Sequence, residues 1–275
     1  MKQIYIFAII LLASLVAGTL LYVFLHRKTR MRLRFLYQDN LAVGIISAII
    51  VYMLYRFEVI TSWIILVMIL LMMVCGTAFV LTMVRFWRTP RRKSKAEKGQ
   101  MISPADGSII YIRKLEKGEI PVSVKGKGYS RLEELAKTSL LDDLGWQIGI
   151  NMTPFDVHKN CAPVSGMVIL NQHFNGKFWS LKDTRSQTEN ERNTYVIQND
   201  EIKVGVVQIA SRMVRRIDSY VKQGESVNQG EWLGMIRFGS QVDVIIPEGY
   251  RVMVEPGEQV YAGLTIIAER DEDSD

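Results

Sequence analysis

The sequence predicts a mainly β domain, of barrel-sandwich or lipoyl-like type with a minor helix, preceded by an α-helical transmembrane region. Long uncharged apolar runs fill the first third, whereas short β-branched runs alternate with Gly and Pro after Met101. Charge divides the chain in the same way: residues 1–95 carry a net charge of +11 and the remainder −5. We therefore expect a membrane anchor at 1–87, a basic juxtamembrane linker at 88–99, the β domain at 100–268 and an acidic tail at 269–275.

Three apolar runs are candidates for membrane-spanning helices. Ile4–Leu25 has 22 residues without a charge and Val59–Val84 has 26, against the roughly 20 that a hydrocarbon core requires. Leu41–Tyr55 has only 15 residues, so an interfacial or re-entrant helix is its alternative. The first run is longer than the apolar part of a signal peptide and a basic stretch follows it, so we expect a retained anchor.

Basic residues predict the orientation of these runs. Five Lys and Arg lie between His26 and Arg34, and six lie in Arg85–Lys95. Both clusters should stay in the cytoplasm, which requires an even number of crossings between them. We therefore expect three spans, with the N-terminus outside and residues 85–275 on the cytoplasmic side of the cell membrane.

The remainder of the chain is predicted to be rich in short strands. One helix is expected at Ser130–Leu144, which is rich in Leu, Glu, Ala and Lys. Val221–Leu233 and Val254–Leu264 share the pattern Val-x-x-Gly-Glu-x-Val-x-x-Gly, whose glycines suit turns with positive φ. Such a repeat suggests paired strands of a barrel-sandwich, and two similar hairpins are the alternative. The expected strands are Ser108–Ile112, Trp146–Asn151, Met167–Leu170, Thr194–Gln198, Lys203–Ile209, Val242–Ile246, Arg251–Val254 and Thr265–Ala268.

Composition excludes several classes of function. Two cysteines, Cys75 and Cys161, cannot form a disulfide framework or a four-cysteine zinc site, and three histidines make a histidine-rich metal centre improbable. We expect no metal. The basic residues of the first third flank apolar runs, which indicates a role in membrane topology and no nucleic-acid partner.

Three motifs carry chemistry: Ser103–Gly107 (SPADG), Thr153–Gly166 (TPFDVHKNCAPVSG) and Arg237–Asp243 (RFGSQVD). In this order they resemble the phosphatidylserine decarboxylase proenzymes, particularly the short bacterial and archaeal forms. The resemblance covers roughly Gly99–Ala268. Where the long forms of that family have Leu-Gly-Ser-Thr, this chain has Phe-Gly-Ser-Gln at 238–241, which keeps the Gly-Ser bond.

The resemblance implies that the chain cleaves itself between Gly239 and Ser240. The hydroxyl of Ser240 would attack the Gly239 carbonyl and form an ester, and elimination would release the upstream chain. A serine hydroxyl needs a base to remove its proton, and His158 has the suitable pKa class. Asp106 would orient His158 and stabilise its charge.

The resemblance also implies the cofactor and the reaction. Ser240 would become a pyruvoyl group at the start of an α chain, 240–275, held by a β chain, 1–239. Its carbonyl would form a Schiff base with phosphatidylserine from the bilayer, accept electrons as CO2 leaves, and yield phosphatidylethanolamine. An archaetidylserine substrate and a homo-oligomer stay open. The candidate substrate-binding residues are Phe155, Arg215 and Arg216. The alternative for the two arginines is a solvated pair at a strand edge.

Two other classes of protein remain as alternatives. A non-enzymatic membrane-anchored barrel-sandwich, such as an adaptor or carrier, would explain the anchor and the repeat but not Asp106, His158 and Gly239-Ser240 together. A carrier also needs a lysine at the turn between the two repeats. A Ser-His-Asp hydrolase would need a Gly-x-Ser-x-Gly elbow, which the sequence lacks.

Overall fold

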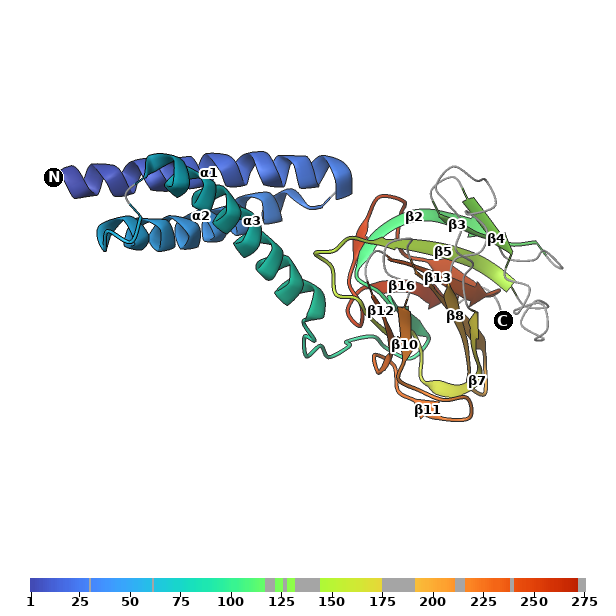
Figure 1. The fold of residues 1–275 in the computed structure, drawn as a ribbon. Coiled ribbons are helices and arrows are strands. Elements are labelled where there is room, and N and C mark those ends of the chain that lie inside the picture. Colours follow the sequence, from blue (N-terminus) through green and yellow to red (C-terminus); the bar gives the residue numbers. More distant parts are fainter. Residues whose placement is uncertain are drawn as a thin grey trace. The chain divides into compact units, whose positions relative to one another are not determined.

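The chain divides into two compact units, Met1–Trp87 and Arg88–Asp275, which are described separately (Figure 1). The first is helical and the second consists of strands, so the predicted fold class, a helical region followed by a mainly β domain, is confirmed. The computed structural model describes residues 1–29, 31–60, 62–116, 122–125, 128–131, 144–174, 191–210, 216–237 and 240–271.

The first unit contains the three expected apolar helices: α1 (Lys2–Thr29), α2 (Leu33–Arg56) and α3 (Trp63–Trp87). Each is long and apolar enough to cross a membrane. Helix α2 has 24 residues and begins upstream of the run Leu41–Tyr55, so it is not the short helix that the run by itself suggested.

An ion pair explains why α2 continues past the polar residues that interrupt its apolar run. Arg85 of α3 donates from Nε to Asp39 Oδ2 over 2.9 Å and from Nη2 to Asp39 Oδ1. The Arg85 guanidinium also lies 4.7 Å from the ring centroid of Phe35. The neighbouring Asn40 donates to Thr19 of α1 over 2.7 Å. Because partner helices satisfy these polar groups, the helix accommodates them.

Small residues bring α1 and α2 close together. The Ser14 hydroxyl donates to the Gly44 carbonyl over 2.8 Å, and a Cβ on Gly44 would lie only 2.5 Å from a Leu15 methyl carbon. Association of helices in a bilayer relies on such close packing, since lipid is as apolar as the side chains that it would replace.

The second unit is built from antiparallel strands. The largest sheet has eight, in the order β11-β7-β8-β9-β13-β5-β2-β15, and two three-stranded sheets have the orders β1-β16-β14 and β10-β12-β6, with β3-β4 as a separate hairpin. The strands are β1 (Gln100–Ile102), β2 (Gly107–Lys114), β3 (Val122–Lys125), β4 (Gly128–Arg131), β5 (Leu144–Met152), β6 (Lys159–Cys161), β7 (Gly166–Phe174), β8 (Arg192–Gln198), β9 (Lys203–Ala210), β10 (Arg216–Ser219), β11 (Ser226–Val227), β12 (Trp232–Arg237), β13 (Ser240–Pro247), β14 (Tyr250–Val252), β15 (Gln259–Val260) and β16 (Ile266–Arg270).

Each of the eight expected strands overlaps an observed one. The helix expected at Ser130–Leu144 is wrong at both ends, because 130–131 belong to β4 and Leu144 begins β5. Residues 132–143 lie outside the described residues. At these two ends a composition that favours helix gives way to strand pairing, with the neighbouring β3 at one end and with β2 and β13 at the other.

The strand orders reveal an internal twofold repeat. In the eight-stranded sheet β15, β2, β5 and β13 mirror β11, β7, β8 and β9, and the three-stranded sheets mirror each other as β1-β16-β14 and β6-β12-β10. The second repeat, β6–β12, is inserted in the first between β5 and β13. Strands β9 and β13 pair antiparallel at the centre and join the two repeats.

Backbone hydrogen bonds follow the same symmetry. The N–H of Ile102 donates to the carbonyl of Pro163 over 3.2 Å, and the equivalent N–H of Cys161 donates to the carbonyl of Pro104 over 2.9 Å. The turns that precede β2 and β7 thus hold each other. The sequence repeat had two interpretations, a repeated unit and two independent hairpins. The repeated unit explains these symmetric hydrogen bonds better.

The glycines of the repeated pattern have the predicted positive φ. Each pattern supplies an edge strand, β11 or β15, at opposite ends of the large sheet. Because a side chain in the left-handed region is strained, glycine is required at these turns. The four φ angles are +90° at Gly224, +85° at Gly230, +92° at Gly257 and +77° at Gly263.

The main hydrophobic core lies between the eight-stranded sheet and the two three-stranded sheets. It combines Ile150 and Val244 of the large sheet with Ile236 and Ile267 of the small ones. The segment expected as a linker also contributes, since Ala96 packs against a cluster formed by Ile102, Cys161 and Ala262.

The ion pair of the helical unit gives a testable expectation. Replacing Arg85 with Met leaves the carboxylate of Asp39 buried without its cation, which costs about 3–5 kcal/mol in comparable sites. We expect Arg85→Met to lower the thermal unfolding midpoint of the detergent-solubilised protein, and Arg85→Met with Asp39→Leu to recover most of the loss. The exposed Arg56→Met is the control, and a double variant as unstable as the single one would contradict this account.

Candidate active site

The site lies where the inserted repeat begins and ends. The junction from β5 to β6 carries Thr153–His158, and the junction from β12 to β13 carries the predicted cleavage site. Phe238 and Gly239 lie outside the described residues, but the backbone on either side is described. Ser240 pairs with Met152, the last residue of β5, and with Ala210, the last residue of β9.

The upstream side of the cleavage site contacts His158 directly. The N–H of Ile236 donates to the carbonyl of His158 over 3.1 Å. Residue 236 is therefore bound to His158, while Ser240 is paired with the strand that leads to it. Backbone contacts thus connect the two junctions, which are 82 residues apart at His158 and Ser240, and the catalytic roles of both residues stay predictions.

His158 is fully buried, and its environment keeps the imidazole neutral. Its Nδ1 lies 2.9 Å from the Asp156 carbonyl oxygen, to which it donates, so Nε2 is the basic nitrogen. Burial lowers the pKa of His158 from 6.5 to about 4, against the opposing effects of the Asp156 hydrogen bond and the Asp106 charge, while Arg88 lowers it further. A neutral imidazole at pH 7 is suited to accept a proton.

A small turn holds the His158 segment in place. The Asp156 carboxylate accepts from the N–H of Thr153 over 2.8 Å and from its hydroxyl over 2.7 Å. Phe155, a predicted substrate-binding residue, is buried in this turn. A contact between Phe155 and substrate stays a prediction.

Asp106 is buried and held by an arginine that the sequence analysis did not single out. Arg92 donates from Nη2 to Asp106 Oδ2 over 3.0 Å and from Nη1 to Oδ1, and it also donates to the Ala262 carbonyl over 2.8 Å. The Asp106 carboxylate also accepts from the N–H of Ala262 over 2.9 Å and from the N–H of Val157 over 3.5 Å. Asp106 therefore reaches His158 through the adjacent backbone and its charge, and its orienting role stays a prediction.

A comparison of the two repeats shows which feature of Asp106 the turn requires and which feature is specific to the first repeat. The equivalent residue of the second repeat is Ser165, whose hydroxyl accepts from the N–H of Gln229 over 2.8 Å, as Asp106 does from Ala262. Ser165 is exposed. The turn thus needs only a hydrogen-bond acceptor, so the buried carboxylate with Arg92 is an addition specific to the first repeat. In the sequence, Arg92 was assigned with its neighbours to membrane topology.

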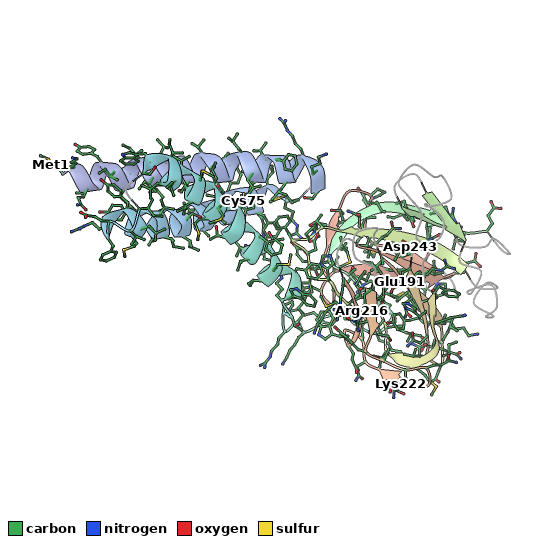
Figure 2. The ribbon with its side chains drawn as sticks, in the orientation of Figure 1. Met1, Cys75, Glu191, Arg216, Lys222 and Asp243 are labelled. Atoms are coloured by element: carbon green, nitrogen blue, oxygen red, sulfur yellow. The ribbon has the colours of Figure 1, made fainter. Side chains whose placement is uncertain are left out.

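Of the two predicted phosphate-binding arginines, Arg216 lies beside the β12–β13 junction, because it pairs with Arg237, two residues before Gly239. Arg215 lies outside the described residues. Arg216 is exposed on β10, where its Nε donates to Asp218 over 2.9 Å, and Asp218 also accepts from Arg237 over 2.7 Å (Figure 2). The surface alternative for Arg216 accounts for this geometry, and phosphate binding stays a prediction.

A second buried carboxylate, Asp243, fixes the strand that begins at the cleavage site (Figure 2). It accepts from the Tyr111 hydroxyl over 2.7 Å, from Gln147 over 2.9 Å and from Gln241 over 2.8 Å. The Tyr111 ring reaches it across Gly149, where a Cβ would lie 2.5 Å from the ring. The third motif contains Asp243, but only the register of β2, β5 and β13 reveals this network.

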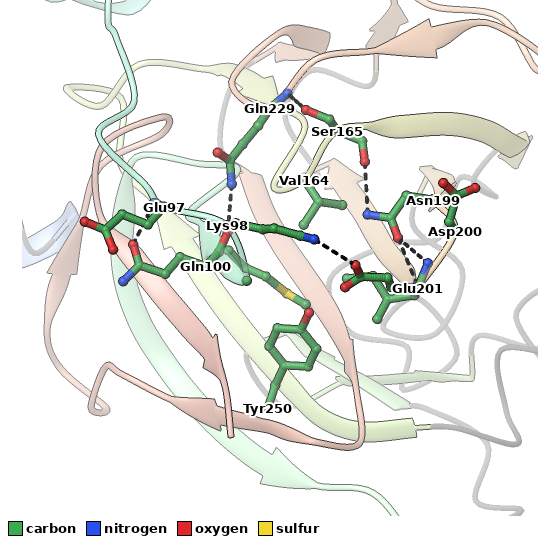
Figure 3. A pocket seen from close by; sticks show the side chains of 13 residues that line it. Glu97, Lys98, Gln100, Val164, Ser165, Asn199, Asp200, Glu201, Gln229 and Tyr250 are labelled. Atoms are coloured by element: carbon green, nitrogen blue, oxygen red, sulfur yellow. Dashed lines mark hydrogen bonds and ion pairs between the residues drawn. The ribbon is translucent and has the colours of Figure 1, made fainter. Parts of the chain in front are cut away.

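A polar cavity of about 370 Å³ lies away from the junctions (Figure 3). The Lys98 ammonium reaches Glu201 over 3.4 Å in it, and Tyr250 forms part of its wall. None of the predicted site residues lines it. The described part of the chain also holds no group of three or more His, Cys, Asp or Glu residues placed to bind a metal ion.

Comparisons with known proteins agree with the geometry. A protein of Methanocaldococcus jannaschii that carries the provisional name archaetidylserine decarboxylase proenzyme is 39% identical over 191 residues, 70% of this chain and 91% of that one. The phosphatidylserine decarboxylase proenzyme of Geotalea uraniireducens is 34% identical over 218 residues, 78% of this chain and 92% of the other. That of Burkholderia ambifaria is 39% identical over 187 residues, 68% and 78% of the two chains.

The family comparison covers the whole β unit up to its acidic tail. The family model described as phosphatidylserine decarboxylase matches residues 79–268, which include all three motifs, both junctions and Arg92. The resemblance inferred from the motifs is thus confirmed. This chain belongs to the phosphatidylserine decarboxylase family, whose enzymes decarboxylate phosphatidylserine.

Proposed function

We propose that this chain is a membrane-anchored proenzyme that cleaves itself between Gly239 and Ser240 and then converts phosphatidylserine to phosphatidylethanolamine and CO2. One observation carries the proposal. Ser240 starts β13 against the end of β5, and the N–H of Ile236, upstream of the predicted scissile bond, donates to the backbone carbonyl of His158, whose buried imidazole is neutral. This arrangement supports His158 as the base for cleavage.

In the proposed cleavage, Nε2 of His158 removes the proton from Ser240 Oγ. The oxygen attacks the carbonyl carbon of Gly239, the C–N bond breaks, and an ester replaces the amide. Loss of the Cα proton of Ser240 then expels the Gly239 carboxylate and leaves a dehydroalanine at the new N-terminus. Its enamine tautomerises to an imine, and water releases ammonia to leave the pyruvoyl group.

The residues around Ser240 fit such a group. The position is the first residue of β13, with the small Ala210 paired opposite and the buried Asp243 fixing the strand three residues later. The pyruvoyl carbonyl would supply the electron-accepting centre for loss of CO2. His158 then holds the proton that returns to the substrate carbon. After cleavage the small chain stays bound, since β13 pairs with β5 and β9 of the large one.

The substrate and the location follow from the anchor and the headgroup chemistry. Three apolar helices place the chain at a membrane, and the flanking basic clusters favour a cytoplasmic β unit. The reaction concerns the serine headgroup alone, which phosphatidylserine and archaetidylserine share. We propose phosphatidylserine as the substrate and expect archaetidylserine to be turned over by the same site.

Cleavage is tested by the intact mass of the purified protein. We expect two chains that separate at Gly239–Ser240, the small one blocked to Edman sequencing, and turnover of phosphatidylserine vesicles. Ser240→Ala should remain one chain without turnover, and Ser226→Ala, at an exposed serine, should behave as the wild type. A folded, membrane-bound wild type that remains one inactive chain would refute the proposal. Archaetidylserine vesicles, assayed in parallel, decide the lipid range.

The buried imidazole gives the pH dependence of cleavage. Because the pKa of His158 lies near 4, the base stays neutral, and we expect a constant cleavage rate from pH 8 to about 5 and a fall of about tenfold for each pH unit below 4. His158→Asn should slow cleavage by about 100-fold or more, whereas His173→Asn, at a half-exposed histidine, should not. A cleavage rate halved near pH 6.5 would contradict the assignment.

The lowered pKa of His158 also makes the folding stability depend on pH. Between pH 6.5 and about 4 the unfolded chain binds a proton on His158 that the folded chain does not, so stability decreases as the pH falls through this range. Circular dichroism at each pH therefore accompanies the rate measurements, so that unfolding is distinguished from protonation of the base.

A further inference from the structure

Two buried amides lie beside the junctions and take no part in the cleavage chemistry. Gln208 of β9 donates from Nε2 to Asn160 Oδ1 of β6 over 2.8 Å, and both side chains are fully buried. Asn160 in turn donates to the Met152 sulfur over 3.7 Å. An amide pair in a core is costly unless every donor and acceptor is satisfied.

The internal repeat shows that the fold does not need these amides. The registers of the two repeats make Met101 the equivalent of Asn160 and Ile246 the equivalent of Gln208. Both equivalents are fully buried members of the main core. The same architecture is therefore filled by apolar side chains in one repeat, and the polar pair occurs only in the repeat that carries His158. Departures of this kind from a fold's own pattern point to function.

One atom of the pair has no partner within the described chain. Gln208 Oε1 is buried and accepts no hydrogen bond. Its Nε2 is engaged by Asn160, which sets the orientation of the amide and directs Oε1 away from that partner. Buried acceptors are rarely left unsatisfied, so this oxygen is expected to receive a donor that the described residues do not supply.

The place of this acceptor suggests which donor arrives. Gln208 pairs with Val242, two residues after Ser240, and Asn160 follows His158 by two residues. Gly234 of β12 packs closely against the Nε2 side of the amide, since a Cβ there would lie 3.2 Å from Gln208 Nε2 and 2.8 Å from the Tyr195 hydroxyl. The acceptor is thus on the strand next to the reacting residue and on the core side of the large sheet.

We propose that Asn160 and Gln208 form the amine-recognition element of the site, in which Gln208 Oε1 accepts a hydrogen bond from an N–H of the serine headgroup and Asn160 positions the amide. The inference rests on the proposed decarboxylase function and adds the residue that selects the headgroup amine. A hydrogen bond to a charged donor is stronger than a neutral one, which suits recognition of an ammonium group.

The test replaces the two amides with the side chains found at the equivalent positions of the other repeat, Met101 and Ile246. Asn160→Met with Gln208→Ile should fold and cleave into two chains, because the fold holds Met and Ile at the equivalent positions. We expect kcat/KM for phosphatidylserine in mixed micelles to fall about 10- to 100-fold, mainly through KM. Gln198→Ile, the same change at an exposed position on β8, is the control and should match the wild type.

A second pair of variants tests the acceptor itself. Gln208→Glu keeps an acceptor oxygen and Gln208→Met, of similar length, does not. We expect the Met variant to lose kcat/KM and the Glu variant to retain it within about fivefold. Binding of short-chain phosphatidylserine to borohydride-reduced, cleaved protein should weaken in the same order, measured by calorimetry without turnover.

The outcomes separate this inference from the proposed function. A wild type that neither cleaves nor turns over phosphatidylserine overturns the proposed function. A wild type that does both, with a double variant of equal kcat/KM, overturns only the amine-recognition element and assigns the orphan acceptor to an internal water. A double variant that fails to cleave, or Glu and Met variants that are equally impaired, would also overturn it, since the pair would then act on folding.

Discussion

The pairing of β9 with β13 is the contact on which the catalytic unit depends. These strands are the last long strand of the inserted repeat and the first strand after it, and their antiparallel ladder joins two four-stranded halves into one sheet. Inserting one repeat in the other forces the chain to cross between them twice. Both crossings end at the same edge of this ladder, so residues distant in sequence meet there. The candidate site is a consequence of that topology.

Polarity distinguishes the two repeats more than backbone structure does. Where one repeat has Ser165, the other has Asp106 with Arg92, and where one has Met101 and Ile246, the other has Asn160 and Gln208. Buried charges and amides are costly, so a fold that is stable with apolar residues at one copy has no structural need for polar ones at the other. Asp106 accepts from the N–H of Val157, next to His158. Asn160 follows His158 by two residues, and Gln208 lies two residues before Ala210, which pairs with Ser240.

Much of the fold could be predicted from local patterns. Short β-branched runs located eight of the strands, although not the six-residue β12, and apolar length located the three helices. The prediction failed where contacts with other segments decide the structure. Helix α2 extends through Asp39 because Arg85 neutralises it, and the helix-like composition around 130 and 144 yields to strand pairing at both ends.

By itself the sequence determined the membrane anchor, the β class and the family, because apolar length, β-branched runs and the three motifs are local properties of the chain. Tertiary structure alone decided that Arg92 holds Asp106 and that the pKa of His158 falls to about 4. It also decided that the buried oxygen of Gln208 has no partner among the residues that the structure describes. Burial, register and the crossing of two repeats are relations between segments far apart in the chain, and no local pattern encodes them.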